Sequence, residues 1–171
     1  PAFVLKTSLR GPNIPVADPE PRLPLCGVDN ALARSALEDA GFGTVLEAGL
    51  GGGVSGFLAI RFHSFPQKRR ARDIWSNAGQ ASAELLDRPA YQRLAAEGAD
   101  RCGLVQLAGR TVGAPFVGAI AGAITVAELV RLANGLSLTA VADLHLRNLD
   151  QRAVVPQELG FGCNPGFVVC G

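Results

Sequence analysis

Residues 23–34 read LPLCGVDNALAR, a short apolar run that ends at Asp29 and Asn30 and continues directly into an expected helix. The apolar run predicts a strand, and the polar pair marks its carboxyl end. Open α/β sheets bind ligands at the carboxyl ends of their strands. The pair could therefore cap the helix, hold a metal ion or meet a nucleotide, and Arg34 lies one helical turn further on.

The composition of the 171-residue chain is that of one globular domain. Hydrophobic residues make up 48%, charged residues 18%, and the formal net charge is +1. This balance excludes general disorder and argues against a nucleic-acid partner, because the densest basic cluster is the short run Lys68-Arg69-Arg70. No secretory leader is expected, so we predict a cytoplasmic protein with reduced thiols.

The four cysteines contain no C-x-x-C pair, which argues against a structural zinc site. Cys26 lies in the apolar run and is expected in the core. Cys102 follows Arg101 and precedes an apolar segment, so a guanidinium and a helix N-terminus would both favour its thiolate. Cys102 is therefore a candidate nucleophile, and a buried inert thiol is the alternative.

Apolar periodicity predicts alternating strands and helices between an irregular, proline-rich lead-in at residues 1–22 and an irregular tail at 149–171. The domain itself is expected at residues 23–148. Strands are predicted at Leu23–Val28, Thr44–Gly49, Phe57–Phe65 and Leu136–Leu146, and helices at Ala31–Ala40, within Ser82–Glu97 and at Phe116–Asn134.

The helix expected at Phe116–Asn134 begins after Pro115 and ends at Gly135. Its uncharged stretch, residues 111–127, is shorter than the roughly 20 residues of a membrane span, so a buried helix is the preferred interpretation and no membrane is expected. Four small residues would allow close approach to a sheet or to a partner subunit: Gly118, Ala119, Gly122 and Ala123.

Residues Gly51–Gly56 match the dinucleotide-binding pattern G-x-G-x-x-G. That pattern meets a pyrophosphate only where a helix begins directly after it. Here Phe57–Phe65 alternates as a strand instead. We therefore interpret the glycines as a strand connection and predict no phosphate-binding loop in this chain.

Three stretches carry a resemblance when they are taken in order: residues 25–34, 45–60 and 102–131. They read as a strand ending in Asp-Asn with an arginine one turn later, two strands joined by a glycine turn, and a helix ending in Ala-x-Glu-x-x-Arg. Together they resemble the ThiF/MoeB superfamily, the ubiquitin-activating-type adenylyltransferases. The resemblance implies an α/β fold, the C-terminal half of a Rossmann-like mixed sheet with flanking helices that lacks the glycine-rich ATP loop.

The resemblance also implies ATP-dependent activation of the C-terminal carboxylate of a ubiquitin-like or sulfur-carrier protein. Asp29 would hold Mg²⁺ beside ATP, with Asn30 at the nucleotide. Arg34 would touch a phosphate or brace Asp29, and Cys102 would take the activated carboxylate as a thioester. Because the first half of the family's domain has no counterpart here, we expect the chain alone to be inactive.

Two other functions stay open. The first is a non-catalytic docking or dimerisation module, with Phe116–Asn134 as the interface of a homodimer, since the resembled family tends to dimerise. The second is a thiol enzyme that pairs Cys102 with His63 or His145. Both histidines lie on expected strands without metal spacing, and we expect them to be partly buried and hydrogen-bonded.

Overall fold

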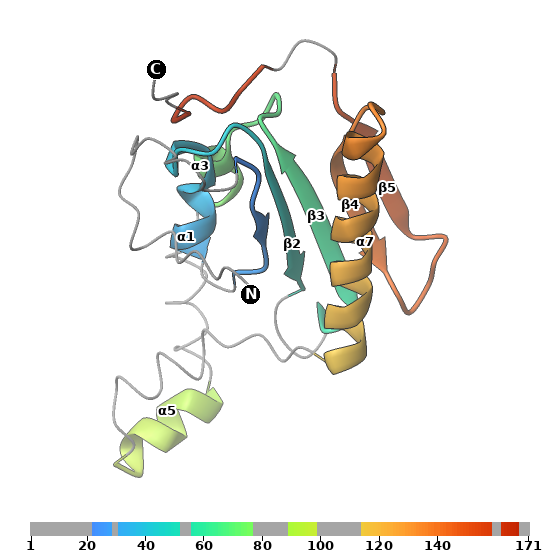
Figure 1. The fold of residues 1–171 in the computed structure, drawn as a ribbon. Coiled ribbons are helices and arrows are strands. Elements are labelled where there is room, and N and C mark those ends of the chain that lie inside the picture. Colours follow the sequence, from blue (N-terminus) through green and yellow to red (C-terminus); the bar gives the residue numbers. More distant parts are fainter. Residues whose placement is uncertain are drawn as a thin grey trace.

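The computed structural model describes residues 22–28, 31–51, 56–76, 89–98, 114–158 and 162–167. Within these ranges five strands form one sheet in the order β1-β2-β3-β4-β5 (Figure 1). They are β1 (Leu25–Cys26), β2 (Val45–Leu50), β3 (Ala59–Phe65), β4 (Thr139–His145) and β5 (Arg152–Pro156). The β1–β2 pair is parallel and the other three pairs are antiparallel, so the sheet is mixed.

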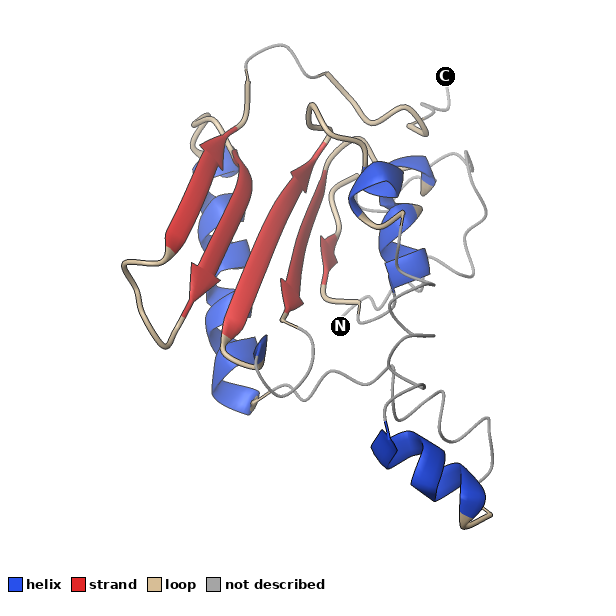
Figure 2. Cartoon of the chain, turned by 180° about the vertical axis from the view of Figure 1, so that it is seen from behind, coloured by secondary structure: helices blue, strands red, loops and turns tan. Residues whose placement is uncertain are grey.

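Helices lie on both faces of the sheet (Figure 2). The long helix α7 (Pro115–Ala133) packs against β2 and β3 on one face. On the other face lie α1 (Ala31–Ser35), the 3-10 turn η2 (Leu37–Asp39) and α3 (Ala71–Ile74). Helix α5 (Pro89–Ala96) stands apart from the sheet in both views. The mixed α/β class expected from the sequence is confirmed.

The sheet differs from a Rossmann arrangement, in which parallel strands are joined by helical crossovers. Only β1 and β2 form such a unit, through α1, and β3, β4 and β5 each run antiparallel to the preceding strand. The expectation of a Rossmann-like sheet therefore holds for one strand pair, and a ThiF-type fold stays a prediction.

The strand expected after the glycine run is confirmed as β3, which pairs antiparallel with β2. Gly51 donates its N–H to the Ala59 carbonyl at 2.8 Å. A Cβ at Gly51 would collide with the Gly56 carbonyl and the Ala59 side chain, so this close approach requires a glycine. The run joins two strands, in agreement with the interpretation that it is no dinucleotide fingerprint.

The structure also differs within residues 149–171, which were expected to be largely irregular. β5 forms there and pairs with β4, with Val154 opposite Ala142. Its consecutive β-branched residues favour an extended chain, and Pro156 is tolerated because β5 is an edge strand. Further on, the Asn164 amide donates to the Phe42 carbonyl at 3.1 Å and ties this segment to the domain.

Helix α7 buries one stripe against the sheet: Val117, Ala121, Thr125 and Glu128. The four small residues, Gly118, Ala119, Gly122 and Ala123, are exposed instead, and nothing lies near a Cβ placed on either glycine. Of the two surfaces expected to meet these small residues, the sheet is therefore ruled out, and a partner subunit stays a prediction. The larger residues of the buried stripe fill the space above β2 and β3, which turns the small residues outward.

By length and composition α7 also meets the requirements of a membrane span. The helix has 19 residues. Its most apolar stretch of 18 residues has a mean hydropathy of 1.8, and only 22% of that stretch is buried. A helix that is mostly buried in the core of a soluble protein passes the same test. Among the described residues α7 is mostly exposed, so the expectation of a buried helix holds only for its inner stripe. The absence of a membrane partner stays an expectation.

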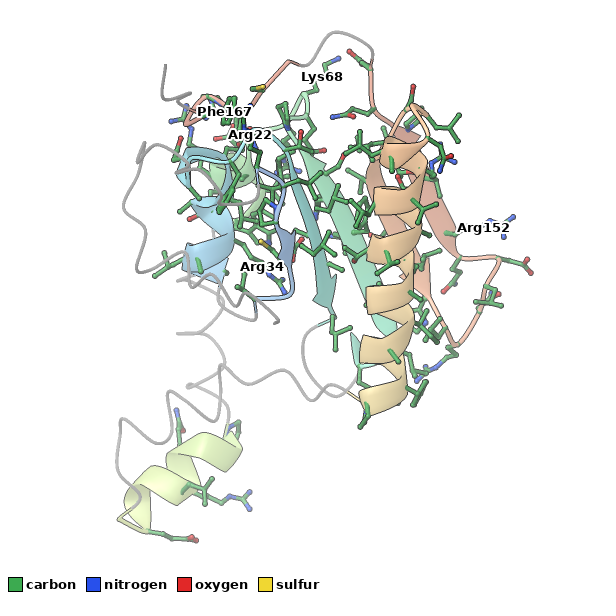
Figure 3. All side chains as sticks on the ribbon, viewed as in Figure 1. Arg22, Arg34, Lys68, Arg152 and Phe167 are labelled. Atoms are coloured by element: carbon green, nitrogen blue, oxygen red, sulfur yellow. The ribbon has the colours of Figure 1, made fainter. Side chains whose placement is uncertain are left out.

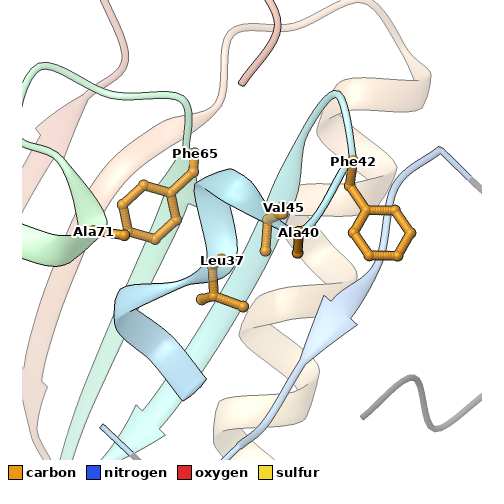
Figure 4. Close-up of a cluster of buried hydrophobic side chains, with 6 residues drawn as sticks. All are labelled: Leu37, Ala40, Phe42, Val45, Phe65 and Ala71. Carbon is orange, nitrogen blue, oxygen red and sulfur yellow. The ribbon is translucent and has the colours of Figure 1, made fainter. Parts of the chain in front are cut away.

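The opposite face of the sheet has its own core (Figure 4). It is built from six buried residues of η2, β2, β3, α3 and the chain between η2 and β2: Leu37, Ala40, Phe42, Val45, Phe65 and Ala71. Trp75 and Phe167 pack against this cluster. The packing holds the 3-10 turn η2 and the short helix α3 in place, since such short helices gain most of their stability from tertiary contacts.

Glu128 connects the end of α7 to the start of β4. One of its carboxylate oxygens accepts the Thr139 backbone N–H at 2.8 Å, and the other accepts the Thr139 hydroxyl at 2.9 Å. Both residues are buried, so these bonds fix the direction in which the chain enters β4.

We predict that Glu128→Ala lowers the free energy of unfolding by about 1–3 kcal/mol, because it leaves a buried N–H and a buried hydroxyl without acceptors. Urea unfolding followed by circular dichroism measures the change. Glu97→Ala, which removes an exposed carboxylate after α5, should stay within about 0.5 kcal/mol of the unsubstituted chain. Equal effects of the two substitutions would contradict the role of Glu128.

Candidate functional site

Of the residues proposed from the sequence, Arg34 lies in the described part of the chain. Asp29, Asn30 and Cys102 lie outside the described residues, so their roles stay predictions. Arg34 is on α1, between that helix and β1 (Figure 3). We therefore build the site outward from Arg34.

The Arg34 guanidinium is held by two oxygens. Its Nε donates to the Val28 carbonyl at 2.7 Å and lies 3.0 Å from Glu47 Oε1. Because Nε carries a single N–H and directs it at Val28, Glu47 Oε1 forms an ion pair with Arg34 but accepts no hydrogen bond. Within the described contacts, Arg34 thus braces the carboxyl end of β1.

Glu47 also holds His63. The two residues are direct partners in the antiparallel register of β2 and β3, which places their side chains on one face of the sheet. Glu47 Oε2 lies 3.1 Å from His63 Nδ1, and both residues are buried. We assign the proton to Nδ1, because an ionised carboxylate can only accept. That assignment leaves Nε2 as the ring nitrogen with the lone pair.

Aromatic rings enclose His63 on the same face. The Trp75 ring meets it edge-on at 5.1 Å between ring centroids, and Phe65 stacks against it at 5.8 Å. The expected hydrogen bond of His63 is confirmed, and the side chain, expected to be partly buried, is almost fully buried. Its apolar surroundings lower the local dielectric and strengthen its interaction with Glu47.

A second, more exposed ion pair lies on the same face, two residues before His63 on β3. Arg61 Nε donates to Asp143 Oδ2 at 2.9 Å, across the β3–β4 pairing. The side chains are 57% and 37% exposed, in contrast with 17% and 1% for Arg34 and Glu47. The face therefore carries a buried charge cluster next to a solvated pair.

These groups line a pocket of about 260 Å³ at the carboxyl end of β2: Arg34, Glu47, Arg61, His63, Trp75 and Asp143. A larger hollow of about 340 Å³, between β1 and α7, is mainly apolar and offers no charged side chain. The polar pocket is therefore the candidate functional site of the described residues.

The remaining titratable candidates do not add a nucleophile to this pocket. Cys26, next to Glu47 in the β1–β2 register, has its pKa raised to about 12 by burial and by the Glu47 charge, so its thiol stays neutral. Cys26 was expected in the core, and the structure places it at the edge of the core, partly buried and packed against the cluster around Phe42. His145 accepts the Arg147 N–H at 3.2 Å, outside the polar pocket.

The described residues contain no group of three His, Cys, Asp or Glu side chains that could hold a metal ion. The Mg²⁺ site expected at Asp29 therefore stays a prediction. Sequence reasoning overlooked Glu47, although one signal was present: it is the single charged residue in the otherwise apolar strand VLEAGL (residues 45–50). A charge in a buried strand requires a partner.

We predict that Glu47→Ala lowers the free energy of unfolding by about 3 kcal/mol, since it leaves the partly buried Arg34 guanidinium without its counter-charge and the buried His63 ring without its hydrogen-bond partner. Asp143→Ala is the matched control in the exposed pair and should cost less than about 1 kcal/mol. Urea unfolding of both variants measures the difference. A cost for Glu47→Ala no larger than that for Asp143→Ala would refute the assignment of Glu47 as the central group.

Comparison with known proteins relates the chain to one family. The family model for the BilD C-terminal domain matches residues 9–136. The bacterial E1-like protein BilD of Collimonas sp. (strain OK412) is 53% identical over 117 residues, which are 68% of this chain and 25% of that protein. The chain thus matches a quarter of the length of this curated relative. No solved structure matches it.

The name of this relative agrees with the ubiquitin-activating character implied by the sequence resemblance, and membership of the ThiF/MoeB superfamily itself stays a prediction. The match to the family model extends over more than half of the chain, including Arg34, Glu47 and His63. The chain belongs to the BilD C-terminal domain family.

Proposed function

We propose that this domain is part of an E1-like protein that uses ATP to activate the C-terminal carboxylate of a ubiquitin-like or sulfur-carrier protein. The observation that carries the proposal is the polar pocket at the carboxyl end of the parallel β1–β2 pair. This is the edge at which α/β sheets bind their ligands. The E1-like name of the relative supports the reaction class.

Carboxylate activation brings several negative oxygens together, so cations in a water-poor site contribute most to catalysis. Arg34 offers such a charge, held by Glu47 and the Val28 carbonyl. In the proposal Asp29 holds Mg²⁺, Asn30 meets the nucleotide and Cys102 receives the activated carboxylate. ATP, when bound with Mg²⁺, supplies the adenylyl group. The site is proposed to work in the cytoplasm, in the context of a longer protein.

ATP–pyrophosphate exchange by an E1-like protein that contains this domain, with its ubiquitin-like carrier, tests the proposal. We expect Asp29→Ala and Arg34→Ala each to slow the exchange by about 100-fold or more, the loss typical of removing a group that stabilises transition-state charge. Arg93→Ala, on the exposed surface of α5, serves as the control and should leave the rate unchanged. Full activity of Asp29→Ala, or no exchange with any carrier, would rule the function out.

A second candidate function is a docking module that forms a homodimer through residues 116–134. The observation in its favour is the outward face of α7, where Phe116, Val126 and Val130 are exposed beside Gly118 and Gly122. Large apolar residues that cluster on an exposed surface mark interaction sites, and small residues between them allow two helices to approach closely.

Light scattering coupled to size exclusion tests the second candidate. We expect a dimer for the unsubstituted chain and a monomer for Val126→Asp, because a charge on the outward face of α7 would have to be buried in the interface. Val126 is 50% exposed, and the control Leu149→Asp changes a residue that is 63% exposed in the β4–β5 connection. A monomeric unsubstituted chain, or a dimer that persists in Val126→Asp, would exclude this interface.

A further inference from the structure

Three contacts locate the Arg34 guanidinium beside the carboxyl end of β1. Its Nε donates to the Val28 carbonyl at 2.7 Å and lies 3.0 Å from Glu47 Oε1. Gly49 leaves room for its terminal nitrogens, since a Cβ there would lie 2.6 Å from both of them. Cys26 lies opposite Glu47 in the parallel register, and the other two contact residues are each two positions further along the chain. The guanidinium therefore bridges the end of β1 and the neighbouring part of β2.

Glu47 and Val28 attract the Arg34 Nε group in different ways. The single N–H on Nε is directed at the Val28 carbonyl. Glu47 Oε1 therefore attracts Arg34 by charge alone, and it is a buried acceptor without a hydrogen bond. A buried acceptor without a donor costs free energy, and only the nearby guanidinium charge offsets that cost. Glu47 thus holds Arg34 in place and leaves its Nε–H to Val28.

Glu47 is firmly anchored, whereas the helix that carries Arg34 is not. The Glu47 side chain is 1% exposed, and its second oxygen lies 3.1 Å from His63 Nδ1 on the neighbouring strand. By contrast, α1 buries none of its five residues, so burial in the apolar core does not fix this helix. The position of the Arg34 guanidinium therefore follows from Glu47.

We propose that Glu47 is a positioning residue for nucleotide binding: through Arg34 it fixes the Val28 carbonyl, and with it the chain that continues into Asp29 and Asn30. The inference rests on the proposed function, which assigns these two residues to the ATP site. The Val28 carbonyl belongs to the planar peptide bond that joins Val28 to Asp29, so its direction restricts the path of the chain beyond it. Glu47 and Arg34 act through contacts that involve no covalent step.

Nuclear magnetic resonance of the full chain labelled with ¹³C and ¹⁵N tests the contact without any reaction. In Glu47→Gln the amide oxygen can still accept the His63 N–H, but the amide nitrogen then faces Arg34 and the attracting charge is gone. We expect the carbonyl ¹³C resonance of Val28 to move upfield, as the loss of a hydrogen bond moves it. An unchanged Val28 resonance would overturn the proposal.

The matched control for this substitution is Asp150→Asn. It also converts a carboxylate to an amide, at an exposed residue in the β4–β5 connection. The Val28 resonance should stay in place in this variant. A shift as large as that in Glu47→Gln would assign the effect to the net charge of the chain and remove Glu47 from the proposed role.

ATP–pyrophosphate exchange by an E1-like protein that contains this domain tests the positioning role. We expect Glu47→Gln to raise the KM for ATP by about tenfold, the loss of one polar contact, and to leave the KM for the carrier protein unchanged. A purely structural role would reduce the amount of folded enzyme, which lowers the apparent kcat and changes neither KM. An unchanged KM for ATP would therefore refute positioning by Glu47.

A double-mutant cycle tests whether Glu47 acts through Arg34. In the Arg34→Ala background, Glu47→Gln should raise the KM for ATP no further, because the contact that transmits its effect is already absent. A further increase of about tenfold in this background would show that Glu47 acts by another route, and would overturn the proposal.

A pair of glycine variants repeats the test without changing any charge. Gly49→Ala displaces the far end of the Arg34 side chain, so it should move the Val28 resonance and the KM for ATP in the same directions as Glu47→Gln. Gly162→Ala places the same methyl group in open space and should change neither. Urea unfolding verifies that every variant is folded. Equal behaviour of the two glycine variants would contradict the geometry of the Arg34 contact.

These outcomes separate the inference from the enzymatic proposal. If the unsubstituted protein shows no exchange, the activating function fails, and the Val28 resonance still decides whether Glu47 fixes the end of β1 through Arg34. If exchange proceeds with an unchanged KM for ATP in Glu47→Gln, the activating function stands and the positioning role of Glu47 fails.

Discussion

One buried carboxylate organises the described site. Glu47 is 1% exposed and faces a guanidinium from α1 and an imidazole from β3, so one side chain joins three elements. Removing a carboxylate from water costs several kcal/mol unless partners replace the lost hydration. The position of α1 over the sheet, the orientation of the His63 ring and the direction of the Arg34 fork all depend on those partners.

The two faces of the sheet serve different purposes. The face beneath α1 and α3 holds the charge cluster and the aromatic rings around it. The other face is covered by α7, whose inner stripe packs on the sheet and whose outer side is apolar and exposed. Ligand binding and dimerisation would thus use opposite sides of the domain, and each can be disrupted without touching the other.

Local patterns predicted the elements better than their arrangement. The apolar run after Pro115 placed α7 to within one residue at each end, and the alternation in Phe57–Phe65 gave the carboxyl end of β3, which begins two residues later than expected. Both patterns depend on residues close in sequence. β5 was overlooked because the prolines and glycines around it outweighed two β-branched residues, and its pairing with β4 is what orders it. The inward face of α7 was left open by the sequence, because a helix that is apolar all round does not reveal which side meets the sheet.

The sequence by itself determined the α/β class, the place of Arg34 one turn beyond a strand, and a lone charge at Glu47 in an apolar strand. Only the tertiary structure decided that Glu47 lies opposite His63, sixteen positions away, and that both meet Arg34 at one pocket. The physical reason is register: alternation within a strand sets which side chains share a face, whereas the partner strand and its alignment depend on the turn and on packing across the whole sheet.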